Sequence, residues 1–194
     1  KFEKDLAQNV DRKHACAVTS GTAALHLALR AIGVNDGDRV YVSDLTFVAS
    51  LQPILYQRAE PVLIDCEPDT WNMSPEALGR ALELDNIRNS LPKAIVLVHI
   101  YGQLADIEKI SSIATEYGIP IIEDAAESLG ATYDSKVSAN KSLITTVSFN
   151  GNKTITTGAG GMLCTNSKKI HDKVKLLAKV GKSKTNYDYV IPGY

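Results

Sequence analysis

The sequence has no long apolar run and no excess of charge of either sign. A membrane helix needs about 20 consecutive apolar residues, and the 194-residue sequence contains no such run. Its 21 basic and 22 acidic residues give a formal net charge of -1, so we expect no field that attracts nucleic acid or an anionic membrane. The charged start, Lys1 to Asp5, does not resemble a secretory signal. These absences predict a cytoplasmic protein with no nucleic-acid or membrane partner.

Cysteine is also scarce. Cys16, Cys66 and Cys164 are odd in number and widely spaced, and each lies in an apolar run typical of a strand. Reduced thiols in the core of a cytosolic protein fit this pattern better than disulfides or metal ligands. We therefore expect no metal site.

The chain lacks internal repeats, low-complexity tracts and linkers. A hydrophobic content of 44% over 194 residues suffices for one well-buried core and leaves little room for a second. This predicts a single domain over residues 1–194. Periodicity is lost after Gly181, and the chain stops at Tyr194 without a closing element, which predicts a domain truncated at its C-terminal end.

Short β-branched runs alternate with longer amphipathic runs, as in βαβ units built on a largely parallel sheet. The fold class is therefore α/β, with a mostly parallel central sheet of about seven strands. We expect the last strand to be antiparallel, because little chain separates it from its predecessor. The predicted strands are Ala15–Thr19, Val40–Ser43, Val62–Asp65, Ile95–His99, Pro120–Glu123, Thr146–Phe149 and Gly161–Thr165.

Three helices are marked by an apolar face or by their ends. Apolar residues spaced for one face of a helix occur over residues 25–32. A second helix is expected between an N-cap at Asp106 and a C-cap at Gly118. Ser74-Pro75 opens a third helix, with the serine as N-cap and the proline in the first turn.

Polar residues follow the first predicted strand directly, where a helix begins. Ser20, Gly21 and Thr22 would direct backbone N–H groups, hydroxyls and the positive end of a helix to one place, which suits a phosphate. The alternative is that Ser20 merely caps the helix. Neither the G-x-G-x-x-G fingerprint nor a P-loop occurs, which disfavours a dinucleotide or nucleoside-triphosphate site.

Two adjacent carboxylates, Glu123 and Asp124, end an apolar strand. Alternation along the strand directs their side chains to opposite faces of the sheet. A carboxylate buried there needs a positive partner, and a protonated ring nitrogen is one candidate. An ordinary helix N-cap or ion pair is the alternative.

Lys153 follows another apolar strand, in a turn of glycine and small polar residues. A lysine amine forms an imine with an aldehyde, and burial beside a cofactor favours the neutral amine that this needs. A solvated surface charge is the alternative, as for any single lysine.

Together these motifs resemble the sugar aminotransferases of the DegT/DnrJ/EryC1/StrS family, which have the aspartate-aminotransferase-like fold of pyridoxal-phosphate enzymes. The resemblance covers nearly the whole chain. It rests on V-T-S-G-T-A-A-L-H-L-A-L at 18–29, G-D-R-V and D-L-T-F-V-A-S within 37–50, P-V-L-I-D at 61–65, V-H-I-Y-G-Q at 98–103, I-E-D-A-A-E-S-L-G-A at 122–131 and V-S-F-N-G-N-K-T-I-T-T-G-A-G-G-M-L at 147–163.

The resemblance implies the cofactor pyridoxal 5'-phosphate and a role for each motif. Lys153 is expected to form the Schiff base with the cofactor, and Asp124 to pair with its pyridine nitrogen. The phosphate would be held by Ser20, Gly21, Thr22 and Ser148. Phe47 would stack on the ring, with a core phenylalanine as the alternative.

The resemblance leaves the roles of three residues undecided and departs from the family pattern in one segment. Glu127 stands where the family often has glutamine near the ring hydroxyl, and its protonation state there is an open question. His99 and Gln103 lie near the same sheet edge but are left out of the predicted site. The segment 138–143 lacks the glycine-rich turn that is common in the family.

By this resemblance the chain is the large domain of the fold, with helices on both faces of the sheet and with the small C-terminal domain missing. The implied reaction transfers an amino group, from glutamate as donor, to a nucleotide-diphosphate-linked keto sugar, in a homodimer with shared active sites. Retention of Lys153 argues against the sugar dehydratases of the family, which use histidine there. The alternatives are a non-catalytic or regulatory fragment that retains the fold, and another reaction of the same cofactor, such as decarboxylation or desulfuration.

Overall fold

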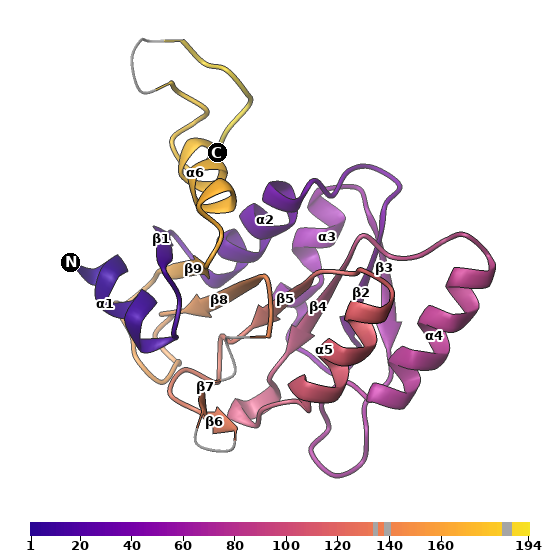
Figure 1. Cartoon of the computed structure of the whole chain (residues 1–194). Helices are drawn as coiled ribbons and strands as arrows, with labels where there is room; N and C mark the ends of the chain where they lie inside the picture. Colours follow the sequence, from indigo (N-terminus) through magenta and orange to yellow (C-terminus); the bar gives the residue numbers. More distant parts are fainter. Residues whose placement is uncertain (134–135, 138–140, 184–187) are drawn as a thin grey trace.

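The structure is a computed structural model that describes residues 1–133, 136–137, 141–183 and 188–194. Within these ranges, seven strands form one sheet in the order β1-β9-β8-β5-β4-β2-β3 (Figure 1). The strands are β1 (His14–Val18), β2 (Arg39–Ser43), β3 (Glu60–Ile64), β4 (Ala94–Val98), β5 (Ile121–Asp124), β8 (Ile144–Ser148) and β9 (Gly161–Thr165).

The predicted strands are confirmed to within two residues at each end. The five neighbours β8, β5, β4, β2 and β3 run parallel. Strand β9 is antiparallel to both β8 and β1, as expected from the short connection that precedes it. A two-stranded hairpin, β6 (Thr132–Tyr133) and β7 (Lys136–Val137), was not predicted.

The helices cover both faces of the sheet (Figure 1). Apolar residues of α2 (Gly21–Ile32), α3 (Gln52–Tyr56) and α6 (Lys168–Leu177) pack with Val40, Val42 and Val96 on one face. Those of α4 (Pro75–Ile87) and α5 (Ile107–Glu116) pack with Tyr41 and Ile95, which alternate with the first set along the strands. Helix α1 (Phe2–Asn9) packs against β1, β8 and β9. The cores on the two faces of the sheet confirm the α/β class and the expectation of helices on both faces.

The predicted helix ends are present, with one shift. Ser74 and Asp106 cap α4 and α5 by accepting the N–H groups of Ala77 and Lys109. The C-cap of α5 is Tyr117, one residue before the predicted position, and Gly118 follows it with φ of +68°. Gly118 thus takes the left-handed position just beyond the helix, where glycine carries no steric penalty.

One cysteine lies elsewhere than predicted. Cys16 and Cys164 are buried in β1 and β9. Cys66 is only partly buried and follows β3, where it forms an isolated bridge with Met73. The apolar run before it ends in β3 at Ile64, so the expectation that Cys66 lies inside a strand was wrong.

The described residues after α6 contain no helix or strand, only a bridge between Lys182 and Tyr189.

The segment 138–143 lacks the glycine-rich turn that is common in the family, and its residues 138–140 lie outside the described ranges. None of the helices in the described ranges is long and apolar enough to cross a membrane.

The topology brings distant segments to one edge of the sheet. The five parallel strands all end at this edge, at Ser43, Ile64, Val98, Asp124 and Ser148. Because β9 is antiparallel, its first residue, Gly161, pairs there with Ser148 and Val18. This edge is where open α/β sheets bind ligands.

Candidate active site

A cavity of about 430 Å³ opens at this edge of the sheet. All eight residues of the predicted site line it: Ser20, Gly21, Thr22, Phe47, Asp124, Glu127, Ser148 and Lys153. They come from four separate stretches of the chain, which the fold brings together around one cavity.

The first wall of the cavity is the N-terminus of α2. Ser20 Oγ accepts the N–H of Ala23 at 3.0 Å, so Ser20 is a helix cap, as one of the two interpretations expected. The cap does not exclude an anion, because the first-turn N–H groups of a helix, here those of Gly21 and Thr22, have no partner within it. The helix adds a partial positive charge at the same point.

Close backbone packing holds this helix end in place. Ser20 forms a bridge with Gly160, and a Cβ built on Gly161 would lie 2.2 Å from the carbonyl carbon of Ser20. A Cβ on Gly21 would lie 2.9 Å from that of Ser148. Glycine at 21 and 161 is therefore what lets β8, β9 and α2 meet, and the contribution of Gly161 was not predicted.

Asp124 ends β5 with its side chain on the α2 face, and only 6% of the residue is exposed. Its Oδ2 accepts a hydrogen bond from Ser50 Oγ at 2.7 Å and its Oδ1 accepts one from the N–H of Ala126 at 3.2 Å. Residues 125–131 form turns, so Asp124 is not a helix N-cap. Burial raises the pKa of Asp124, and the hydrogen bond from Ser50 opposes that rise in pKa.

Glu123 points to the opposite face, as alternation predicted. Its carboxylate is fully buried and lies 3.2 Å from His99 Nε2, 2.9 Å from Thr145 Oγ1 and 2.5 Å from Ser142 Oγ. Arg12 Nη2 lies 3.7 Å away. Burial alone would raise the pKa of Glu123, but His99 and the two hydroxyls outweigh it and bring the pKa below its usual value.

His99 and Gln103, which were left out of the predicted site, make contacts within the protein. The N–H of Ala105 donates to His99 Nδ1 at 3.2 Å, so Nε2 bears the proton that faces Glu123. His99 borders the cavity but is 0% exposed, which fits a core histidine. Gln103 Nε2 donates to the carbonyl of Leu104 at 3.3 Å.

Lys153 and Glu127 form an ion pair in the cavity. Lys153 Nζ lies 3.2 Å from Glu127 Oε1, and the lysine side chain is only 14% exposed. The alternative of a solvated surface lysine is therefore wrong. Glu127 Oε2 accepts the N–H of Tyr101, at 2.7 Å, in the 3-10 turn η2 (Ile100–Gly102). The carboxylate of Glu127 thus ties Lys153 to the end of β4.

Phe47 lies between β2 and the 3-10 turn η1 (Val48–Ser50), with 69% of its surface exposed. It lines the cavity, so the alternative of a core phenylalanine is wrong. Its ring offers an apolar face to an occupant of the cavity.

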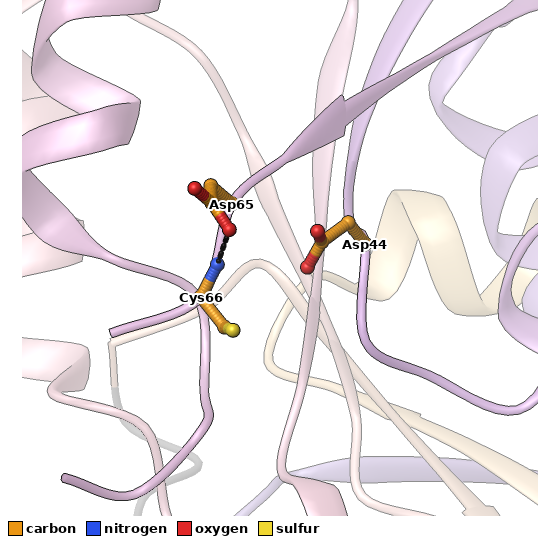
Figure 2. A group of neighbouring side chains, drawn as sticks. All are labelled: Asp44, Asp65 and Cys66. Atoms are coloured by element: carbon orange, nitrogen blue, oxygen red, sulfur yellow. Dashed lines mark hydrogen bonds between the residues drawn. The ribbon is translucent and has the colours of Figure 1, made fainter. Parts of the chain in front are cut away.

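A second polar cluster lies outside the cavity lining (Figure 2). Within the described part of the chain, ligand atoms of Asp44, Asp65 and Cys66 lie within 4.8 Å of one another, after the ends of β2 and β3. Both aspartates are exposed, and Asp65 Oδ1 accepts the N–H of Cys66 at 2.9 Å. Exposed acidic groups commonly gather without an ion, so the cluster carries no metal assignment.

Comparison with known proteins places the chain in a family. The model of the DegT/DnrJ/EryC1/StrS aminotransferase family matches residues 1–194. EpsN of Bacillus subtilis strain 168, which bears the name of a pyridoxal phosphate-dependent aminotransferase, is 53% identical over 177 residues, which are 91% of this chain and 46% of EpsN. A GDP-perosamine synthase of Caulobacter vibrioides is 44% identical over 93% of this chain and 47% of its own length.

A crystal structure of a DegT DnrJ EryC1 StrS aminotransferase from Brucella abortus superposes with a TM-score of 0.93 and 34% identity. The superposition covers 99% of this chain and 52% of the Brucella abortus chain. The chain thus spans about half the length of the relatives that it matches. On the family model and on these identities, the chain belongs to the DegT/DnrJ/EryC1/StrS aminotransferase family.

Proposed function

We propose that the protein is a pyridoxal-phosphate-dependent aminotransferase that aminates a nucleotide-linked keto sugar. The observation that carries the proposal is that Lys153, Asp124 and the N-terminus of α2 line one cavity. A cofactor with an aldehyde, a basic ring nitrogen and a phosphate needs those three kinds of group.

The residues present fit this cofactor. Ser20, Gly21, Thr22 and Ser148 offer hydroxyls and first-turn N–H groups for a phosphate. A ring nitrogen would meet Asp124, whose carboxylate has only neutral donors in its two hydrogen bonds. When bound, the cofactor supplies a carbonyl that accepts an amino group and a ring that withdraws electrons.

Lys153 is the residue that we assign to covalent attachment and to proton transfer. Lys153 lines the cavity, and its amine would there take up a proton as a base and return it as an acid. Glu127 holds Nζ in place before the cofactor arrives, because the two groups are ion-paired. Phe47 would lie against the ring.

The substrates are proposed from the relatives. Relatives include GDP-perosamine synthases and a UDP-2-acetamido-2-deoxy-3-oxo-D-glucuronate aminotransferase, which supports a nucleotide-linked sugar with a keto group as acceptor. Glutamate as donor, a homodimer with shared active sites and a single cofactor-binding domain over residues 1–194 are part of the same proposal. Because the chain spans about half of each relative, substrate contacts from a longer protein belong to that proposal as well.

Absorbance spectroscopy tests the first half of the reaction. We expect a Schiff-base band when pyridoxal phosphate is added to the purified protein, and conversion to the amine form of the cofactor when glutamate follows. Lys153→Ala should show neither change. Lys141→Ala, at an exposed lysine paired with Glu108, is the matched control and should behave as the wild type.

Two other outcomes have defined meanings. A band in Lys153→Ala, or none in the wild type, contradicts the assignment of Lys153. A band that persists with glutamate and with every other amino donor supports a non-catalytic protein that keeps the fold and the cofactor.

A further inference from the structure

A pair of hydroxyls lies behind Asp124, between it and the turn that carries Phe47. Ser50 Oγ donates to Asp124 Oδ2 at 2.7 Å, and Thr46 Oγ1 lies 2.8 Å from Ser50 Oγ. Ser50 is only 2% exposed. Both hydroxyls belong to the D-L-T-F-V-A-S motif at 44–50, in which only Phe47 was predicted to be a site residue.

The direction of these hydrogen bonds follows from the number of protons. An ionised carboxylate only accepts, so the single hydroxyl proton of Ser50 is directed to Asp124. Thr46 Oγ1 must then donate to Ser50, a proton that it shares with the carbonyl of Phe47 at 3.4 Å, and the two hydroxyls form a chain that ends on the carboxylate. Hydrogen bonds in such a chain polarise and strengthen one another.

The other carboxylate oxygen is also held. The N–H of Ala126 donates to Asp124 Oδ1 at 3.2 Å. With one donor on each oxygen, the plane of the Asp124 carboxylate is fixed, and the remaining lone pairs are available to an occupant of the cavity.

The same turn presents the aromatic face. Phe47 lies between Thr46 and Ser50 in sequence, and the N–H of Ser50 donates to the carbonyl of Phe47 at 3.0 Å. A shift of the turn would therefore move Phe47 and at the same time break the hydrogen bond between Ser50 and Asp124. The position of Phe47 and the position of the Asp124 carboxylate are thus coupled through the turn.

We propose that Thr46 and Ser50 are positioning residues that hold the turn 46–50 against Asp124. They thereby place the ring of Phe47 and the carboxylate of Asp124 so that both can contact one planar ring with a protonated nitrogen. This inference rests on the proposed function for the identity of the ring. The hydroxyl chain itself is independent of the cofactor.

The titratable groups around Asp124 are the same in the variants that test this proposal. His99 from the end of β4 and Lys153 from the loop after β8 both act on the carboxylate, and Glu127 pairs with Lys153. Removal of a neutral hydroxyl leaves all three unchanged. Loss of the Ser50 hydrogen bond should raise the pKa of Asp124 further, since that bond opposes the effect of burial.

The first experiment measures cofactor affinity as a function of pH. Ser50→Ala should raise the apparent Kd for pyridoxal phosphate about tenfold and move the acid limit of binding to higher pH, since the variant loses a hydrogen bond to the charged carboxylate. Thr46→Val, which keeps the shape and removes the hydroxyl, should raise Kd about threefold. Thr46→Ser keeps the hydroxyl and should bind as the wild type does.

Ser43→Ala is the matched control, because Ser43 is a buried serine at the end of β2 that does not line the cavity. Equal losses in Ser43→Ala and Ser50→Ala, or an unchanged Kd and acid limit in Ser50→Ala, overturn the proposal. Thermal unfolding of each variant without cofactor checks that it folds.

Carbon-13 NMR titration of the Asp124 carboxyl without cofactor separates this proposal from the proposed function. Its midpoint should move to higher pH in Ser50→Ala and in Thr46→Val but not in Ser43→Ala. Should the wild type fail to bind the cofactor, the proposed function fails, and this titration still confirms or overturns the hydroxyl chain.

Discussion

The buried carboxylate of Asp124 destabilises the protein as long as no cation meets it. Burial raises its pKa, so the carboxyl of Asp124 loses its proton less readily in the folded state than in the unfolded state. Its contribution to stability is fully present below the unfolded pKa of about 3.9 and is lost as the pH rises through the raised pKa of the folded state. At neutral pH the charged form therefore opposes folding.

Asp124→Asn should make the cofactor-free protein more stable by about 1 kcal/mol near neutral pH, since it removes a buried charge. Urea unfolding at a series of pH values measures this, and the gain should vanish below about pH 3.9. Asp44→Asn, at an exposed aspartate, should show no such gain. A less stable Asp124→Asn protein at neutral pH contradicts the account.

The site residues that could be predicted are those whose chemical type is uncommon in their sequence context, such as a charged residue next to an apolar strand. Lys153 after an apolar strand and Asp124 at a strand end stand out in sequence, and both line the cavity. Thr46 and Ser50 do not stand out, because small hydroxyl residues are common in turns. Only the packing of the turn against β5 shows that their hydroxyls reach Asp124.

The junction of α2 with β9 depends on a residue without a side chain. A Cβ on Gly161 would lie 2.2 Å from the carbonyl carbon and oxygen of Ser20 and 2.5 Å from the nitrogen of Gly21. These are backbone atoms, which cannot rotate away. The start of α2 must therefore move if Gly161 gains a methyl group.

Gly161→Ala should cost about 2 to 4 kcal/mol of stability and weaken phosphate binding, because overpacking here displaces the helix end. Gly79→Ala is the matched control: nothing lies within 4 Å of its added Cβ, and alanine should stabilise α4 by about 0.5 to 1 kcal/mol. Urea unfolding measures both changes. A Gly161→Ala protein as stable as the wild type would show that the contact is not tight.

Whole elements were predicted best where the sequence period is clear. The strands of the large sheet are apolar and β-branched, and they were located to within two residues. Helix α6 is rich in lysine and was not predicted, although Ile170, Val174 and Leu177 have the spacing of one helical face. The hairpin of β6 and β7 has two residues in each strand, too few to show alternation.

The N-terminal turn is attached to the interior of the molecule by one charged side chain. Arg12 is only 6% exposed and donates to Ser142 Oγ at 2.6 Å and to Thr145 Oγ1 at 3.1 Å, beside the buried Glu123. In sequence, D-R-K reads as an ordinary surface segment, so this contact was not predicted. It joins the start of the chain to β5 and β8, on the face of the sheet opposite to the Asp124 side chain.

Arg12→Met should destabilise the protein by about 3 kcal/mol, because it leaves the carboxylate of Glu123 buried without its cation. Glu123→Gln in the same chain removes the uncompensated charge, and the double variant should recover part of the loss. Urea unfolding of the single and double variants gives the coupling between the two residues. Additive losses would show that the two side chains act independently.

Chemical trapping of the cofactor tests the central claim most directly. The purified protein is mixed with pyridoxal phosphate, reduced with borohydride, digested and mapped by mass spectrometry. We predict that the pyridoxyl group is found on Lys153 and is lost in Lys153→Ala but not in Lys141→Ala. A label on other lysines, or a label that persists in Lys153→Ala, would contradict the account.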